Sequence, residues 1–316
     1  MAKLPKLIQN EWMKLWSKKG TWVMMVLLVA MIAGMFGLTK WIQTMNDYDE
    51  PDWKSVVQGE LTNVQEQLGN PMLSDSKKER LEGKEKILEY RLANSVEPLD
   101  ANSREKMIMD SSGIGSIVVL LTVIVAAGIV AAEFSQGTIK MLLSRPVKRW
   151  KILTSKYVTV MLFGALLMLV GFVVSVVCAY LFFQAGTGQE LVWNGKEVVA
   201  ASIWGKGLYM LLLSFGNVFM TATFAFMIGS VFRSSSLAIG LSLFIYFMGN
   251  TVVMILSQYE IVKYIVFTHM DLTIYESDFR IVEGMTMPFS LAVLAVYLVV
   301  FLVISYTTFV KRDVTA

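Results

Sequence analysis

The sequence predicts an all-helical membrane protein with six membrane-spanning helices. The chain of 316 residues is 55% hydrophobic and 17% charged, with a mean hydropathy of +0.57. It contains six apolar runs, each near the ~20 residues that cross ~30 Å of hydrocarbon. Almost no charge falls inside them, as expected when a central charge costs ~2.5–3.5 kcal/mol on insertion. The predicted spans are 20–39, 110–132, 157–183, 207–231, 237–257 and 288–310.

The distribution of Lys and Arg predicts which side each loop faces. Six spans place both termini on one side, and the termini and short loops of that side carry 14 Lys and Arg, against 4 in the short loops opposite. Because basic residues accumulate in cytoplasmic loops, both termini are expected in the cytoplasm. The predicted cytoplasmic segments are 1–19, 133–156, 232–236 and 311–316, and the predicted extracellular ones are 40–109, 184–206 and 258–287.

Residues 1–19 form a basic, amphipathic stretch before the first span. Its apolar residues follow helical spacing: Leu4, Leu7, Ile8, Trp12, Leu15 and Trp16. Such a helix lies in the membrane interface with its lysines near anionic headgroups. Two roles stay open, an anchor that sets topology and a mechanical element.

The first outer loop, 40–109, predicts a helical hairpin outside the membrane. Apolar residues recur at helical spacing from Trp53 to Leu68, and Pro71 ends the pattern. A Ser76-x-x-Glu79 capping box then predicts a second helix through Leu92. The hairpin is either a solvated cap or a ligand-sensing domain.

The last outer loop, 258–287, is too apolar for a free loop and too short and broken to span the membrane. We expect a shallow pair of helices that dips into the outer leaflet. The single histidine of the chain, His269, lies here beside Asp271. The sequence favours a solvated loop residue over a metal ligand at this position.

The chain lacks the common sequence motifs of nucleotide-binding and catalytic sites. There is no G-x-x-x-x-G-K-[ST] loop for ATP phosphates, no H-E-x-x-H and no G-x-S-x-G. No Asp or Glu lies in the middle of a span, where a proton relay would need one. The one cysteine, Cys178, excludes an intramolecular disulfide. We therefore expect no catalytic residues and no bound cofactor or metal, and an energy supply from another protein.

The segment 133–156 is the most informative part of the sequence. It carries six Lys and Arg and a single acid, Glu133, interleaved with apolar residues such as Met141, Leu142 and Leu143. A loop that only turned the chain around would not need that apolar set. The alternative is that its basic residues only enforce topology and bind lipid phosphates.

These residues resemble the signature of ABC-2-type permeases, the membrane subunits of bacterial ABC exporters. The matching residues are Glu133-x-x-x-Gly137-Thr138, Leu142-Leu143, Arg145-Pro146, Arg149 and Lys156, with Asn10-Glu11-x-x-Lys14-Leu15 near the N-terminus. The resemblance implies a fold similar to the type V exporters of the ABCG class. It implies a bacterial plasma membrane location, a second permease subunit, identical or homologous, and two copies of a soluble ATP-binding subunit that hold ATP and Mg. Beyond these and membrane lipids, we expect no nucleic-acid partner.

The resemblance also implies a coupling helix between the second and third spans that docks on the ATP-binding subunit. The docking residues would be Gly137, Thr138, Met141, Leu142, Leu143, Arg145, Pro146, Lys148 and Arg149. Glu133 is expected to pair with a nearby Arg or Lys or to cap the next helix. Four polar span residues either line a path or hydrogen-bond between helices: Thr122, Asn217, Asn250 and Thr251.

The large first outer loop resembles a subgroup of these permeases linked to peptide-antibiotic export or resistance. The expected substrate is thus a peptide antibiotic, a lipid or another amphipathic compound. The competing hypothesis is a membrane-anchored sensor or scaffold whose extracellular hairpin binds a ligand. Copurification with a soluble ATPase would separate the two.

Overall fold

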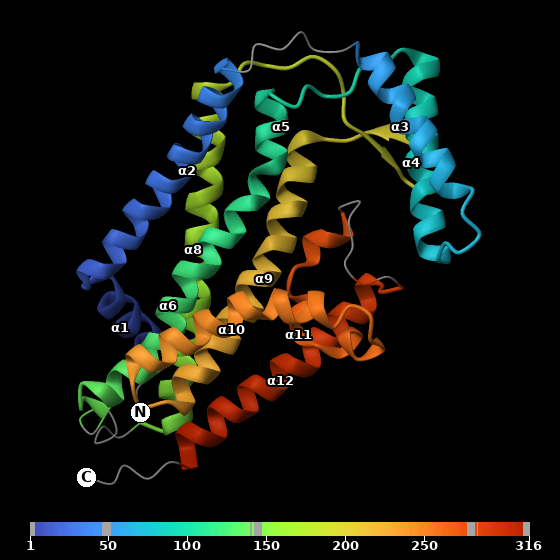
Figure 1. The fold of residues 1–316 in the computed structure, drawn as a ribbon. Coiled ribbons are helices and arrows are strands. Elements are labelled where there is room, and N and C mark those ends of the chain that lie inside the picture. The colour runs from blue at the N-terminus through green and yellow to red at the C-terminus, as the bar shows by residue number, and fades with distance from the viewer. Residues whose placement is uncertain are drawn as a thin grey trace. The chain divides into compact units, whose positions relative to one another are not determined.

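The computed structural model (Figure 1) describes residues 4–45, 52–139, 141, 147–276, 282 and 284–311. It confirms the all-helical membrane fold, with six helical stretches long and apolar enough to cross a membrane. They are α2 (Lys19–Met45), the run of α5 (Arg104–Met109), η1 (Asp110–Gly113) and α6 (Ile114–Ser135), then α8 (Arg149–Phe182), α9 (Ile203–Val231), α10 (Ser235–Ile255) and α12 (Met287–Lys311). The protein is a multi-pass membrane protein.

Most of these helical stretches extend beyond the expected spans. Helix α2 continues past residue 39 to Met45, and α8 begins at Arg149, inside the segment predicted as a cytoplasmic loop. The expected third span begins at residue 157, because spans were predicted as runs with almost no charge inside. A charge inside a helix does not interrupt its backbone hydrogen bonds, so the helix continues through Lys156.

The chain divides into two compact units, and the first contains residues 1–30, 113–171 and 212–316. In this unit α6 is the most buried span and packs against α10. Small residues allow the close approach of neighbouring helices. A Cβ added at Gly229 of α9 would lie 2.2 Å from the carbonyl oxygen of Ala127 on α6, and one at Gly164 of α8 would lie 3.2 Å from Thr122. Larger side chains at these glycines would force the helices apart.

The second unit contains residues 31–112 and 172–211. Helices α3 (Trp53–Leu68) and α4 (Asp75–Asn94) form the expected hairpin. Its core consists of Val57, Leu61, Val64, Leu81 and Leu88. A short antiparallel pair, β1 (Leu191–Trp193) and β2 (Val198–Ala200), packs against α4. The sequence predicts only a loop over residues 184–206 and gives no sign of this strand pair.

The predicted capping box of α4 is wrong. The helix begins at Asp75, and Ser74 is its N-cap residue. The carbonyl oxygen of Ser74 already accepts the N–H groups of Lys77 and Lys78, so the first turn is complete before Ser76 could cap it. The negative charge of Asp75 in that turn also favours the earlier start.

Between α10 and α12 the described residues, 256–276, 282 and 284–286, include three short helical elements, η2 (Glu260–Tyr264), α11 (Val266–Met270) and η3 (Leu272–Tyr275). The expectation of a solvated His269 is wrong, because its side chain is fully buried. Its Nε2 lies 2.8 Å from the carbonyl oxygen of Lys263, and its Nδ1 lies 2.6 Å from Oγ of Ser290. A carbonyl can only accept, so Nε2 carries the proton and Nδ1 accepts from Ser290. Burial in this network replaces the water expected around the ring.

Candidate functional site: a buried charge cluster

The N-terminal helix α1 (Leu4–Trp16) carries the first two residues of the site. Glu11 and Lys14 are three positions apart and therefore share one face of the helix. Side chains of the next helix cap α1: the hydroxyl of Thr21 donates to the carbonyl of Leu15 at 2.6 Å, and Nε1 of Trp22 donates to that of Trp16 at 3.1 Å. These bonds satisfy carbonyls that a helix end leaves unpaired and fix α1 against the start of α2.

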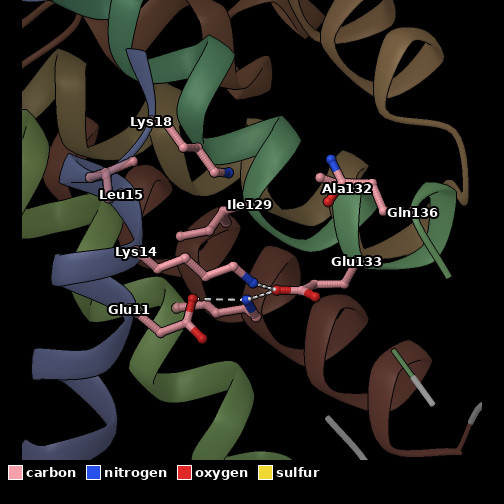
Figure 2. A pocket seen from close by; sticks show the side chains of 9 residues that line it. Glu11, Lys14, Leu15, Lys18, Ile129, Ala132, Glu133 and Gln136 are labelled. Atoms are coloured by element: carbon pink, nitrogen blue, oxygen red, sulfur yellow. Dashed lines mark hydrogen bonds and ion pairs between the residues drawn. The ribbon is translucent and has the colours of Figure 1, made fainter. Parts of the chain in front are cut away.

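Three helices bring their charges together at one point (Figure 2). Nζ of Lys156, on α8, lies 2.8 Å from Oε2 of Glu11 and 2.8 Å from Oε1 of Glu133 at the end of α6. Lys14 also pairs with Oε1 of Glu133. We call Glu11, Lys14, Glu133 and Lys156 the charge cluster. Its two carboxylates and two ammonium groups balance, which is the condition for burying such groups.

The charge cluster is largely shielded from solvent. The side chain of Lys156 is 1% exposed, and those of Glu11 and Glu133 are 6% and 5% exposed. Lys14 lies at the edge of the charge cluster, and its side chain is 43% exposed. Buried charges of this kind are tolerated only when paired, and loss of one partner leaves an uncompensated charge in a poorly solvated place. The cluster therefore constrains α1, α6 and α8 to one arrangement.

The turn after α6 extends the cluster. Thr138 donates its hydroxyl hydrogen to the second carboxylate oxygen of Glu133. Gly137 has a φ of +70°, a left-handed conformation that residues with a Cβ rarely adopt. The glycine lets the chain reverse within a few residues, so that Thr138 reaches back to Glu133. The pattern Glu133-x-x-x-Gly137-Thr138 thus has a local structural reason.

The structure places the predicted docking residues in different ways. Gly137 and Thr138 adjoin the charge cluster, whereas Met141 is 70% exposed and Lys148 is exposed. Arg149 is the first residue of α8 and donates from Nη1 to the carbonyl of Val310 at 3.1 Å. The remaining predicted docking residues lie outside the described part of the chain: Leu142, Leu143, Arg145 and Pro146.

The four predicted path residues differ in their surroundings. Thr122 is buried on α6 and its hydroxyl has no hydrogen-bond partner among the described residues. Asn217, on α9, accepts from the hydroxyl of Thr221 at 3.0 Å, a bond within one helix. Asn250 and Thr251 are exposed on α10. No group of three or more His, Cys, Asp or Glu that could hold a metal occurs in the described ranges.

Glu133 is an ion-pair candidate from the sequence, whereas Glu11, Lys14 and Lys156 are not predicted as members of a site. Two of these residues are charges at otherwise apolar positions, which the sequence shows. Glu11 is an acid on the apolar face of α1, between Ile8 and Leu15, and Lys156 stands near the start of a long apolar helix. A buried position for a charge predicts a partner, although periodicity cannot say which one.

Comparison with known proteins identifies the family of this chain. A family model described as "Protein of unknown function (DUF2705)" matches residues 85–315, which include Glu133 and Lys156. The chain belongs to this family. "Uncharacterized protein YhcI" of Bacillus subtilis (strain 168) is 36% identical over 316 residues, covering 98% of each chain.

A second relative supports the membrane assignment. "Uncharacterized membrane protein YdbK" of the same organism is 31% identical over 197 residues, which cover 61% of this chain and 76% of the relative. The similarity to YhcI extends over almost the whole of both chains, so this DUF2705 protein and YhcI are similar in length.

Proposed function

We propose that this protein is the permease subunit of an ATP-driven exporter, which docks on a separate ATP-binding subunit. One observation carries the proposal: the charge cluster holds both ends of the segment 136–148. Glu133 lies just before this segment, and Thr138 lies near its start. Lys156 lies one to two turns into α8, the helix that follows the segment. A force applied to this segment would therefore act on α1, α6 and α8 together.

The composition of the segment supports a protein partner. Its apolar residues around Met141–Leu143 with surrounding Arg and Lys have the make-up of an interface, with an apolar centre and a charged rim. The exposure of Met141 and Lys148 leaves both side chains accessible to a partner. Energy from ATP would then enter the membrane helices through a contact, since the chain has no phosphate-binding loop of its own.

The proposed assembly has two permease subunits and two ATP-binding subunits in a bacterial plasma membrane. The substrate class, an amphipathic compound such as a peptide antibiotic or a lipid, comes from the resemblance to ABC-2-type permeases. The excess of Lys and Arg on one side supports cytoplasmic termini. In intact cells, a cysteine in place of Glu85 on the helical hairpin should react with an impermeant thiol reagent, and one in place of Lys148 should not. The reverse labelling pattern would refute this orientation.

The docking step is tested by copurification of the ATP-binding subunit with variants at equal membrane expression. Leu142→Asp places a charge at the apolar centre, where losses of ~2 kcal/mol or more are common, and should remove the partner and transport-linked ATP hydrolysis. Lys148→Ala removes a rim charge and should weaken binding mainly by slowing association. Lys54→Ala, on the hairpin, is the matched control and should bind normally. If Leu142→Asp retains the partner fully, the segment only connects two spans, and the docking proposal is refuted.

A further inference from the structure

Helix α12 is hydrogen-bonded at both of its ends to other parts of the first unit. In the described ranges it is the least buried of the six candidate spans, so side-chain packing alone holds it less firmly than the others. Figure 1 shows the helix running from beside α11 towards the C-terminus. The hydrogen bonds at its two ends therefore matter more for its position than they would in a fully packed helix.

The C-terminal end of α12 is bonded to the first turns of α8. Nη1 of Arg149 donates to the carbonyl of Val310 at 3.1 Å. That carbonyl lies in the last turn of α12, where backbone acceptors lack partners within the helix and a cation is favoured. Oγ1 of Thr154 lies 2.8 Å from the carbonyl of Trp150 and 2.6 Å from the hydroxyl of Tyr306. Because Thr154 gives its single hydrogen to the carbonyl, Tyr306 donates to Thr154.

These contacts lie next to the segment 136–148. Arg149 follows residue 148 directly, and Thr154 lies in the second turn of the same helix. On the other side of the segment, the ring of Phe134 lies edge-on to that of Phe309, with centroids 6.4 Å apart. Helix α12 therefore contacts the chain both just before and just after the segment 136–148.

The N-terminal half of α12 is bonded to η2, α11 and η3. We call residues 260–275 the short-helix segment. The hydroxyl of Tyr297 donates to the carbonyl of Tyr264 in η2 at 3.0 Å. Oγ of Ser290 is hydrogen-bonded to His269 of α11 and to the hydroxyl of Tyr275 of η3. Each of the three short elements is thus bonded directly to α12.

Between these two sets of contacts, α12 has the sequence of a stiff helix. Residues 290–310 contain neither Gly nor Pro, the usual causes of a kink. With a rise of ~1.5 Å per residue, Ser290 and Val310 lie about 30 Å apart along the axis. A displacement of one end is therefore passed to the other end and is not absorbed by a bend.

We propose that Tyr306 and Arg149 are positioning residues that make α12 a rigid link between the segment 136–148 and the short-helix segment. This role differs from the docking role expected for Arg149. The use of the link in transport rests on the proposed function, because only a docked ATP-binding subunit would drive it. The link itself is a property of this chain alone and would serve a sensor equally well.

The test is hydrogen exchange of the purified full-length protein in neutral detergent, without a partner, followed by mass spectrometry. Tyr306→Phe removes one hydroxyl and keeps the ring, so the packing of this helix end is retained. Amides of the short-helix segment should exchange about twofold to tenfold faster, the range set by one neutral hydrogen bond. Thr307→Val is the matched control, because the hydroxyl of Thr307 bonds to the carbonyls of Val303 and Ile304 in α12 itself. It should leave exchange of the short-helix segment unchanged.

The opposite perturbation tests the link in reverse. Ser290→Ala removes the bonds to α11 and η3, and a coupling between two sites acts equally in both directions. Exchange in the first turns of α8 should therefore also rise. Helix α6, the most buried span of the same unit, is the internal reference, and its unchanged exchange shows that the unit has not unfolded.

The second positioning residue has its own pair of variants. Arg149→Met removes the donor to Val310 and should act like Tyr306→Phe, whereas Arg149→Lys keeps a charged donor and should exchange like the wild type. Equal exchange in the two Arg149 variants would remove Arg149 from the link.

Other outcomes separate the link from the proposed function. An unchanged short-helix segment in Tyr306→Phe, or an equal change in Thr307→Val, would reject the link. So would an unchanged α8 in Ser290→Ala. Tyr306→Phe should still copurify with the ATP-binding subunit, and loss of the partner would make Tyr306 a docking residue instead. If Leu142→Asp retains the partner while the exchange differences persist, the docking proposal fails and the link stands.

Discussion

Replacing Lys156 with methionine removes the ammonium group that joins Glu11 to Glu133 and keeps a long, flexible side chain in the same space. Because Lys156 is 1% exposed and the two carboxylates are 6% and 5% exposed, water cannot readily replace the lost partner. Removing one member of a buried ion pair typically costs ~3–5 kcal/mol. We expect the free energy of unfolding of Lys156→Met to fall by about that amount.

Two further variants locate the source of the loss. Lys14→Met removes a partner of Glu133 that is 43% exposed, while Lys156 and Thr138 remain, so it should cost about 1 kcal/mol or less. In Glu11→Gln/Lys156→Met the uncompensated carboxylate of Glu11 is gone. The double variant should therefore be more stable than Lys156→Met, because it no longer contains the buried unpaired charge of Glu11.

The assay is unfolding of the purified protein by titration with a denaturing detergent, followed by far-ultraviolet circular dichroism. The wild type and the three variants are compared in one neutral detergent and at one pH. If Lys156→Met is no less stable than Lys14→Met, the cluster is hydrated and does not hold the helices together. If the double variant is less stable than Lys156→Met, the carboxylate of Glu11 is not the source of the cost.

Three further predictions concern other parts of the chain. Gly137→Ala should lower the stability by ~1–2 kcal/mol because of its φ of +70°, and Gly137→Asn should cost less; equal melting temperatures of the two variants would contradict this. Burial lowers the pKa of His269 in the folded protein. As the pH falls through about 6.5, the unfolded state therefore takes up a proton before the folded state does. The folded protein thus loses stability on acidification. The melting temperature of His269→Gln should depend less on pH over this range, and an unchanged slope would count against the argument. Trp193→Ala should speed proteolysis of the helical hairpin, because Trp193 contacts Gly83 and Lys86 on α4, whereas Val199→Ala at an exposed position should not.

The six long helices were predictable because each depends on local composition. An uncharged apolar run of membrane length has few alternatives to a helix, and the hairpin of α3 and α4 follows from the apolar spacing between Trp53 and Leu92. The start of α4 was misplaced by two residues, because Ser74 and Ser76 are chemically equivalent as caps. Ser74 takes the N-cap position through its backbone, without a capping hydrogen bond from its side chain, and side-chain propensity does not describe that choice.

The charge cluster was predictable only in part. An unpaired acid at Glu133 suggested an ion pair, and the structure provides it through Lys156 and through Lys14, which lies 119 positions earlier in the chain. Such distant pairing depends on how the helices pack, so the spacing of charges in the sequence does not predict it. His269 shows the same limit: a loop residue next to an acid resembles a solvated residue until the buried Ser290 and the carbonyl of Lys263 are placed around it.

The charge cluster also sets an order for biogenesis. Glu11 is synthesised 145 positions before Lys156, its buried partner. A nascent chain that contains only the first two membrane helices thus has two carboxylates, Glu11 and Glu133, with Lys14 as their only cluster lysine. The N-terminal helix cannot reach its final position until α8 has been synthesised and inserted. A product that ended before α8 would leave the carboxylate of Glu11 without Lys156, its buried partner.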